Sequence, residues 1–196
     1  MKVSIGVSNR HVHLTEHDFK ILFGDDVLDE RNDLTQPGQF ASNKTVTLKG
    51  PKGEIENVRI LGPFRNYTQV EVSMTDSYKL GITPPVRNSG DLNGSASIEI
   101  IGNKGSLVIN EGVIIATRHI HLTEEHMKLY GLSGKSVVDV LIGGEKGAII
   151  KNVYLKVSDQ AYFELHLDTD DANANLIKNK DIGEILWKKY IWHFLY

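Results

Sequence analysis

The stretch Ser8-Asn9-Arg10-His11-Val12-His13-Leu14-Thr15-Glu16 recurs in diverged form as Ala116-Thr117-Arg118-His119-Ile120-His121-Leu122-Thr123-Glu124, 108 positions later. A match of Arg, His, a β-branched residue, His, Leu, Thr and Glu in the same order is too specific to arise by chance. The chain is therefore predicted to be a diverged internal repeat, and its two halves should fold in the same way.

Length and composition are typical of a soluble globular protein. The 196 residues are 40% hydrophobic, with 22 Lys and Arg against 25 Asp and Glu and a formal net charge of −3. No run approaches the roughly 18 apolar residues that span a membrane, and the N-terminus lacks a signal-peptide pattern. We expect a cytoplasmic protein with no membrane contact, and the lack of clustered Lys and Arg argues against nucleic acid as a partner.

Around each copy of the motif, the pattern predicts short strands and one short helix. Thr15 and Thr123 are suited to cap helices that end near a glycine. His17 and His126 lie in these helices, where solvated faces explain them. Period-two alternation predicts strands at 45–48, 54–61, 69–74, 97–100, 136–142, 148–150, 152–157 and 162–167. We expect a mostly β chain of two small β-barrels or sandwiches, with short capping α-helices.

The two His-x-His pairs are predicted metal ligands. On a strand, residues i and i+2 share a face, so His11 lies beside His13 and His119 beside His121. The chain has no cysteine, so a metal must be held by His and carboxylate, and zinc is the natural occupant. One such pair could be two ordinary polar residues. Its presence in both halves favours two metal sites.

Each site needs a third protein ligand, which the repeat places on an equivalent strand. Aligning the two halves pairs Glu71 with Glu164 and Ser73 with His166. The first half can then supply Glu71, whereas the second can supply His166 or Glu164, of which we choose His166. A solvent-facing strand carboxylate would explain Glu71 and Glu164 equally well.

These motifs resemble the PduL-type phosphate acyltransferases, the phosphotransacylases of bacterial acyl-CoA metabolism. The similarity covers nearly the whole chain, and its specific segments are 8–14, 61–65, 68–71, 84–92 and 118–121. The resemblance implies two β-barrels with a dinuclear zinc site, in an enzyme that moves an acyl group between coenzyme A and phosphate. It also implies that the first strand joins the second half, which gives the domains 9–116 and 1–8 with 117–196.

The resemblance assigns roles to individual residues. Two sets of three match the family's ligands for two zinc ions per chain: His11, His13 and Glu71, and His119, His121 and His166. Five match its coenzyme A contacts: Ser8, Arg59, Leu61, His166 and Asn173. One lysine contact of the family has no counterpart near Asn32 and Asp33.

Arg65 and Ser89 match the family's phosphate-binding residues. Independently of the resemblance, Arg65 follows a Gly-Pro turn and precedes the predicted strand of Glu71. Ser89 and Gly90 can offer a concavity of backbone N–H groups to an anion. The simpler explanation is that Arg65 is a surface arginine and that Ser89 and Gly90 form an ordinary turn.

Two other functions fit the same ligands. A two-zinc hydrolase would cleave thioesters or phosphoesters with a metal-bound hydroxide, and a non-catalytic metal-binding barrel would have closed coordination. Arg65 and Ser89 favour the transferase, which exchanges a short acyl group, acetyl or propanoyl, reversibly between acyl-CoA and acyl phosphate. Acetyl and propanoyl groups differ by one methylene. An apolar pocket can use this difference to discriminate between them by only about 1–3 kcal/mol, so the sequence leaves the choice of acyl group open.

The C-terminal segment 185–196 carries both tryptophans. At about 25 cal/mol per Å² of exposed apolar area, we predict that it is buried, either at a homodimer interface or in an intramolecular clasp over the second barrel. The resemblance favours the homodimer, because the family includes dimeric members. Microcompartment-associated members of the family carry an N-terminal targeting extension, whereas here the motif already begins at Ser8. We therefore expect a free cytosolic enzyme.

Overall fold

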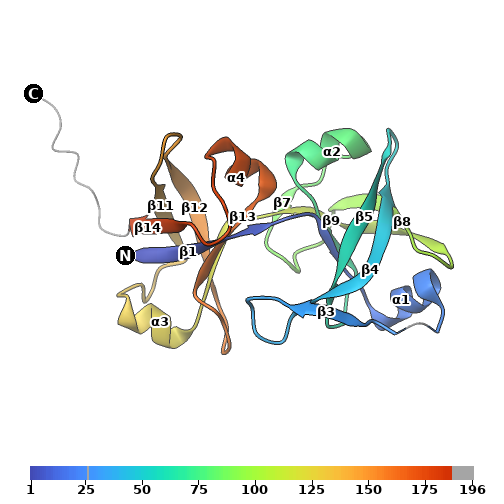
Figure 1. Cartoon of the computed structure of the whole chain (residues 1–196), viewed down its shortest axis with the longest axis horizontal. Coiled ribbons are helices and arrows are strands. Elements are labelled where there is room, and N and C mark those ends of the chain that lie inside the picture. The colour runs from blue at the N-terminus through green and yellow to red at the C-terminus, as the bar shows by residue number, and fades with distance from the viewer. Residues whose placement is uncertain (26, 187–196) are drawn as a thin grey trace, which may run out of the picture. The chain divides into compact units, whose positions relative to one another are not determined.

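A computed structural model describes residues 1–25 and 27–186. The chain divides into two compact units, each built mainly of strands (Figure 1). Barrel I comprises Ser8–Thr117 with Asp168–Asp170, and barrel II comprises Met1–Val7, Arg118–Leu167 and the described residues from Asp171 onward. Among the described helices, none has the length and apolarity required to cross a membrane.

Barrel I is a ring of six strands with two further strands attached. Its strands are β2 (His11–His13), β3 (Glu30–Asp33), β4 (Phe40–Lys49), β5 (Glu54–Gly62), β6 (Gln69–Glu71), β7 (Val86–Arg87), β8 (Ala96–Ile101) and β9 (Ser106–Ala116). The ring runs β4, β5, β2, β6, β9 and β8, and closes because β8 also pairs with β4. β3 and β7 are attached to β4 and β9, and the helices are α1 (Glu16–Phe23) and α2 (Met74–Leu80).

Barrel II is a closed ring that takes its first strand from the N-terminus. Its strands are β1 (Lys2–Ser8), β10 (His119–Leu122), β11 (Val137–Ile142), β12 (Ala148–Val157), β13 (Glu164–Asp168) and β14 (Ile182–Leu186). β1 lies between β13 and β14 in the ring, with Val3 opposite Gly183. The helix α3 (Glu124–Leu129) follows β10, and α4 (Thr169–Ala174) follows β13.

The two barrels repeat one arrangement around the His-x-His strand. β2 pairs in parallel with β5 and antiparallel with β6, just as β10 pairs in parallel with β12 and antiparallel with β13. Asn57 in β5 and Asn152 in β12 both adopt a left-handed backbone with φ of 58°. Asparagine tolerates this conformation better than most residues. The repeat is therefore kept in backbone geometry as well as in motif.

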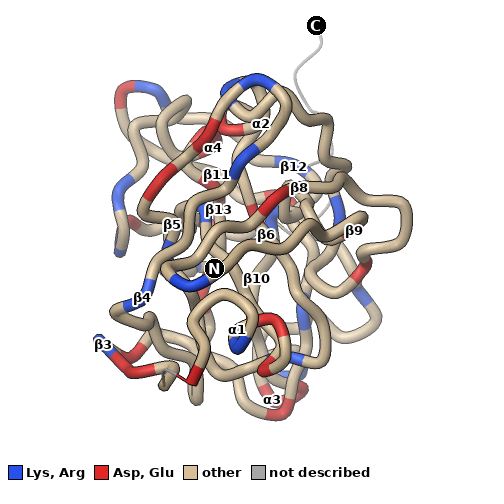
Figure 2. The backbone as a smooth tube through the Cα atoms, turned by 90° about the vertical axis from the view of Figure 1, so that its right-hand side faces the viewer, with Lys and Arg blue, Asp and Glu red and all other residues tan. Residues whose placement is uncertain are grey.

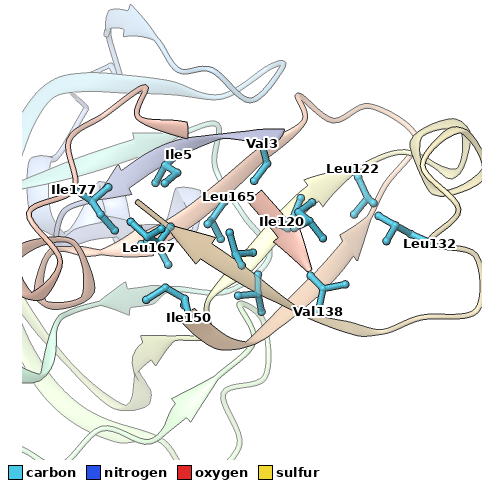
Figure 3. Packing of buried hydrophobic residues seen from close by; sticks show 14 of the residues in the cluster. Val3, Ile5, Ile120, Leu122, Leu132, Val138, Ile150, Leu165, Leu167 and Ile177 are labelled. Carbon is cyan, nitrogen blue, oxygen red and sulfur yellow. The ribbon is translucent and has the colours of Figure 1, made fainter. Parts of the chain in front are cut away.

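Each core lies on the face of the sheet opposite the histidines. Ile120 and Leu122 are fully buried in barrel II and point into the cluster that Figure 3 shows, where Leu165 lies close to Ile120. Val12 occupies the corresponding position in the core of barrel I. Because neighbouring strand residues face opposite ways, burying Ile120 directs His119 and His121 to the other face.

The predicted fold class is confirmed, since both rings and short helices form. Thr15 and Thr123 cap the two predicted helices. The predicted strand 69–74 is too long: it ends at Glu71, because Ser73 caps α2 by accepting the backbone N–H of Asp76.

Some strands were not predicted, and one was divided. β3 has no apolar residue and is fully exposed, so it has no alternation to recognise. In β14, one of the inward positions is Gly183, which hides the pattern. The predicted strands 148–150 and 152–157 are one strand, β12, with the left-handed Asn152 inside it.

Charged residues are spread along the chain. In Figure 2, Lys and Arg alternate with Asp and Glu over the described residues, for example around β3. The predicted buried tail is the segment 185–196, of which residues 187–196 lie outside the described residues.

Replacing Ile120 with Ala should lower the free energy of unfolding by about 2–5 kcal/mol, because the fully buried side chain leaves a cavity. The matched control is Leu129→Ala on α3, where the side chain is 70% exposed and we expect a change below about 0.5 kcal/mol. Urea denaturation measures both. Equal losses in the two variants would contradict this account of the core.

Candidate metal centres and anion site

The structure brings together both predicted ligand sets. In each set the possible ligand atoms lie within 4.8 Å of one another. The sets are His11, His13 and Glu71 in barrel I, and His119, His121 and His166 in barrel II. In each pair the two rings meet edge to face, with centroids 5.0 Å apart in barrel I and 4.7 Å apart in barrel II.

Strand register explains why these residues meet. His11 lies directly opposite Glu71, and His119 lies directly opposite His166. His166 is thus the positional counterpart of Glu71, and the sequence alignment that paired Glu71 with Glu164 is wrong by two residues. The cause is the early end of β6, which stops at Glu71 where β13 continues to Asp168.

In barrel I, the backbone fixes the proton position of His11. Its Nδ1 lies 2.8 Å from the carbonyl oxygen of Asn9, which can only accept, so Nδ1 carries the proton. In the neutral imidazole the lone pair is then on Nε2, which lies 3.5 Å from Oε2 of Glu71. A histidine oriented by a backbone carbonyl and facing a carboxylate is the usual arrangement of a metal ligand and its support.

In barrel II, three imidazoles converge. Nε2 of His119 and Nε2 of His121 lie 3.1 Å apart, and Nε2 of His166 lies 2.8 Å from Oε2 of Glu164. Burial lowers the pKa of His121 most strongly, and the nearby His119 and His166 lower it further, to about 2. His121 is therefore neutral at pH 7, the state in which an imidazole can bind a metal. Neutral imidazoles with a carboxylate and no thiolate suit zinc.

Gly6 makes room for the three converging histidines of barrel II. A Cβ atom on this β1 residue would lie 2.8 Å from Oε2 of Glu164 and 3.2 Å from Cδ2 of His166. Glu164 is itself buried, so its carboxylate has little space to retreat. The first strand therefore both closes the barrel and leaves space beside the three histidines.

The structure also brings Arg65 and Ser89 together. A guanidinium N–H of Arg65 donates to Oγ of Ser89 over 3.2 Å, and the side-chain amide of Gln69 donates to the same oxygen over 2.9 Å. Both lone pairs of the hydroxyl are then used. Towards a third group, Ser89 can act only as a donor, which suits an anion.

Gln69 connects the Arg65 and Ser89 pair with the candidate metal ligands of barrel I and was missed in the sequence. The fully buried side chain donates to Oε1 of Glu71 over 2.6 Å and accepts the N–H of Gly90 over 2.8 Å. The expectation that Gly90 offers its N–H to an anion is therefore wrong, because Gln69 uses that group. Its position in the sequence could have indicated it. Gln69 lies two residues before Glu71 and on the same strand face, just as Glu164 lies two residues before His166.

The predicted coenzyme A contacts are distributed over both units. Ser8, Arg59 and Leu61 belong to barrel I, whereas His166 and Asn173 belong to barrel II. Arg59 lies opposite His11 in the register of β5 and β2. One of its guanidinium nitrogens donates to the carbonyls of Ser42 and Asn43, each over 2.9 Å.

Of the two helical histidines, His17 is exposed as predicted, but His126 is only partly exposed and is held by specific contacts. Its Nδ1 accepts the backbone N–H of Thr123 over 3.2 Å, which caps α3. Its ring stacks on Tyr130, with centroids 5.8 Å apart, and contacts Phe163. His126 therefore has a structural role.

Comparison with known proteins finds a matching family model and several similar proteins that share the same description. The family model described as phosphate propanoyltransferase matches residues 4–178. The phosphate propanoyltransferase of Thermotoga maritima is 48% identical over 186 residues, 94% of this chain and 89% of the relative. Those of Rhodopseudomonas palustris and Priestia megaterium are 46% and 49% identical, over 95% and 92% of this chain and 83% and 84% of each relative.

Replacing Gly6 with Ala should lower the free energy of unfolding by about 1–3 kcal/mol, since the added methyl group is forced against the buried Glu164. The control is Gly143→Ala, where a Cβ atom meets open space and φ is not positive; there the change should stay below about 0.5 kcal/mol. Chemical denaturation in the presence of a chelator measures both. A Gly6 variant as stable as the Gly143 variant would show that β1 does not restrict this space.

Proposed function

Because the chain belongs to the phosphate propanoyltransferase family and is thus an acyltransferase, we propose that it transfers a short acyl group reversibly between coenzyme A and inorganic phosphate. The acyl group is propanoyl or acetyl. The observation that carries the proposal is the link through Gln69, which binds both Glu71 and Ser89. An anion held by Ser89 and Arg65 would therefore lie close to the candidate metal group of barrel I.

We propose that each chain holds two zinc ions, one in each barrel. His11, His13 and Glu71 would hold one, and His119, His121 and His166 the other. When bound, zinc supplies a Lewis acid that polarises the acyl carbonyl and favours departure of the thiolate. With three protein ligands, each site keeps a fourth position for substrate.

Arg65 and Ser89 would hold the phosphate. The guanidinium offers paired N–H donors to two phosphate oxygens, and Ser89 donates its hydroxyl proton because Arg65 and Gln69 already occupy its lone pairs. Fixing phosphate in this way raises its effective concentration and aligns one oxygen for attack. Gln69 holds Ser89 and Glu71 in a constant relation, so that the phosphate and the ligand group keep their spacing.

The acyl transfer itself then needs no covalent enzyme intermediate. A phosphate oxygen attacks the thioester carbonyl, a C–O bond forms and the C–S bond breaks. The phosphate releases one proton to solvent, and coenzyme A leaves as thiolate and takes up one proton from solvent. In reverse, the thiolate attacks the acyl phosphate. Ser8, Arg59, Leu61, His166 and Asn173 are the proposed coenzyme A contacts, among which Arg59 supplies a positive charge for its phosphates.

One assay separates this function from the two alternatives. Loss of propanoyl-CoA that depends on added phosphate and yields acyl phosphate indicates the transferase. Loss without phosphate indicates a hydrolase, and no loss in the presence of zinc indicates a metal-binding barrel without catalysis. We expect the first result, and either of the others would overturn the proposal.

Three further features remain proposals. They are the domain boundaries 9–116 and 1–8 with 117–196, the cytoplasmic location, and the homodimer. Light scattering of the purified chain tests the last: a mass of one chain, about 22 kDa, would contradict a dimer.

Purified protein should contain two zinc ions per chain, and His11→Ala and His119→Ala should each remove one of them together with most of the activity. The reason is that loss of one ligand leaves only two in that barrel. Elemental analysis measures the metal, and His17→Ala on the exposed face of α1 is the control. Active wild-type protein free of transition metal would contradict the assignment.

Arg65→Ala should keep both zinc ions but raise the KM for phosphate and lower kcat. Loss of a charge-assisted contact of about 1.5–3 kcal/mol corresponds to a fall of about 10- to 150-fold in kcat/KM for phosphate. Steady-state kinetics at varied phosphate measure this, with Arg31→Ala on the exposed strand β3 as control. If the kinetics of the variant depend on phosphate as those of the wild type do, Arg65 does not bind phosphate and is an ordinary surface residue.

A further inference from the structure

Each His-x-His pair is preceded by an arginine that binds an aspartate on the helix after the third-ligand strand. In barrel I, Nε and one terminal nitrogen of Arg10 each lie 2.8 Å from Oδ1 of Asp76 on α2. In barrel II, Nε of Arg118 lies 2.6 Å from Oδ2 of Asp171 on α4, and a terminal nitrogen lies 2.6 Å from Oδ1. The same ion pair is thus formed twice, once inside each unit.

The spacing of these pairs follows the ligands. Arg10 and Arg118 each stand one residue before the first histidine of their pair. Asp76 stands five residues after Glu71, and Asp171 stands five residues after the His166 position. Each ion pair therefore links the start of the His-x-His strand with the helix that follows the third-ligand strand. The repeat thus keeps the ion pair at the same spacing from the candidate ligands in both halves.

Burial makes the pair in barrel I a firm connection. The Asp76 side chain is 4% exposed and that of Arg10 is 35% exposed. Asp76 also accepts the backbone N–H of Ser73 through its other oxygen, over 3.2 Å. Through these contacts Arg10 is tied to the start of α2, two residues beyond Glu71.

In barrel II, the pair has the fork geometry in which two N–H groups meet both carboxylate oxygens. Arg118 additionally donates to the carbonyl of Lys151 in the neighbouring strand β12, over 3.2 Å. It therefore connects α4 with β12 from its place beside the ligand strand β10. Lysine cannot reproduce such a fork, because its ammonium group is a single point charge.

We propose that Arg10–Asp76 and Arg118–Asp171 are positioning pairs that hold the third ligand of each barrel opposite its two histidines, and thereby set the metal affinity of that barrel. The inference rests on the proposed zinc sites. When the third ligand is already in place, metal binding does not have to order it, and the affinity is higher. Residues that support ligands in this way typically change metal affinity 10- to 100-fold when they are replaced.

The test measures zinc affinity one barrel at a time. In a His119→Ala background only barrel I keeps three ligands, and in a His11→Ala background only barrel II does. Competition with a zinc chelator then gives the affinity of the remaining site. We expect Arg10→Lys to weaken zinc about 10-fold or more in the first background, and Arg118→Lys to do the same in the second. Arg10→Gln and Arg118→Gln are second variants in case lysine partly replaces arginine.

The control is an ion pair of barrel I that lies away from the ligands. Lys49 and Glu99 join β4 and β8 over 3.0 Å, and Glu99→Gln should leave the zinc affinity unchanged. The absorption of Co²⁺ bound in place of zinc gives a second reading, because its visible spectrum changes when a ligand moves. A purely structural pair would not alter that spectrum in a folded variant.

The outcomes are distinguishable. Zinc binding weakened in both arginine variants and intact in Glu99→Gln supports the proposal. Unchanged zinc affinity and an unchanged Co²⁺ spectrum, with a lower free energy of unfolding, would overturn it while leaving the zinc sites standing. If the single-site backgrounds and the wild-type chain bind no zinc at all, the proposed function fails first and this inference fails with it.

Discussion

The antiparallel pairing of each His-x-His strand with its third-ligand strand is the constraint on which both barrels depend. It sets His11 opposite Glu71 and His119 opposite His166, and at the same time turns Val12 and Ile120 into the two cores. A slip of one residue would exchange the faces, turning the imidazoles into the apolar cores and Val12 and Ile120 out of them. The same strand register is therefore required for core packing and for ligand placement. The hydrophobic effect that closes the barrel also brings the candidate ligands together.

The two barrels keep the backbone of the repeat but differ in the residues that surround the histidines. Where barrel I has Gln69 and Glu71, barrel II has Glu164 and His166 at the same register positions. An amide at the first of these positions can donate to Glu71 and Ser89 together, whereas a carboxylate can only accept when ionised. The difference between Gln69 and Glu164 thus distinguishes a barrel in which the candidate metal ligands are linked to Ser89 from one in which three imidazoles meet.

Much of the site could be predicted because its decisive residues are close in sequence. The His-x-His pairs follow from strand geometry, and the two predicted helices follow from their threonine caps. The third ligands depended on aligning two strands of different length, and the alignment failed where Ser73 turns the chain into α2. The arginine–aspartate pairs lie 66 and 53 residues apart. No local pattern indicates contacts of that range, which only the closed rings bring about.

The central claim is that each barrel binds one zinc ion on two histidines and the residue that faces the first of them. Anomalous diffraction from crystals at the zinc absorption edge tests it most directly. The account predicts two peaks per chain, each about 2.0–2.2 Å from its ligand atoms: one at His11, His13 and Glu71, and one at His119, His121 and His166. A peak ligated by Glu164 in place of His166, or the absence of a peak from either barrel, would contradict it.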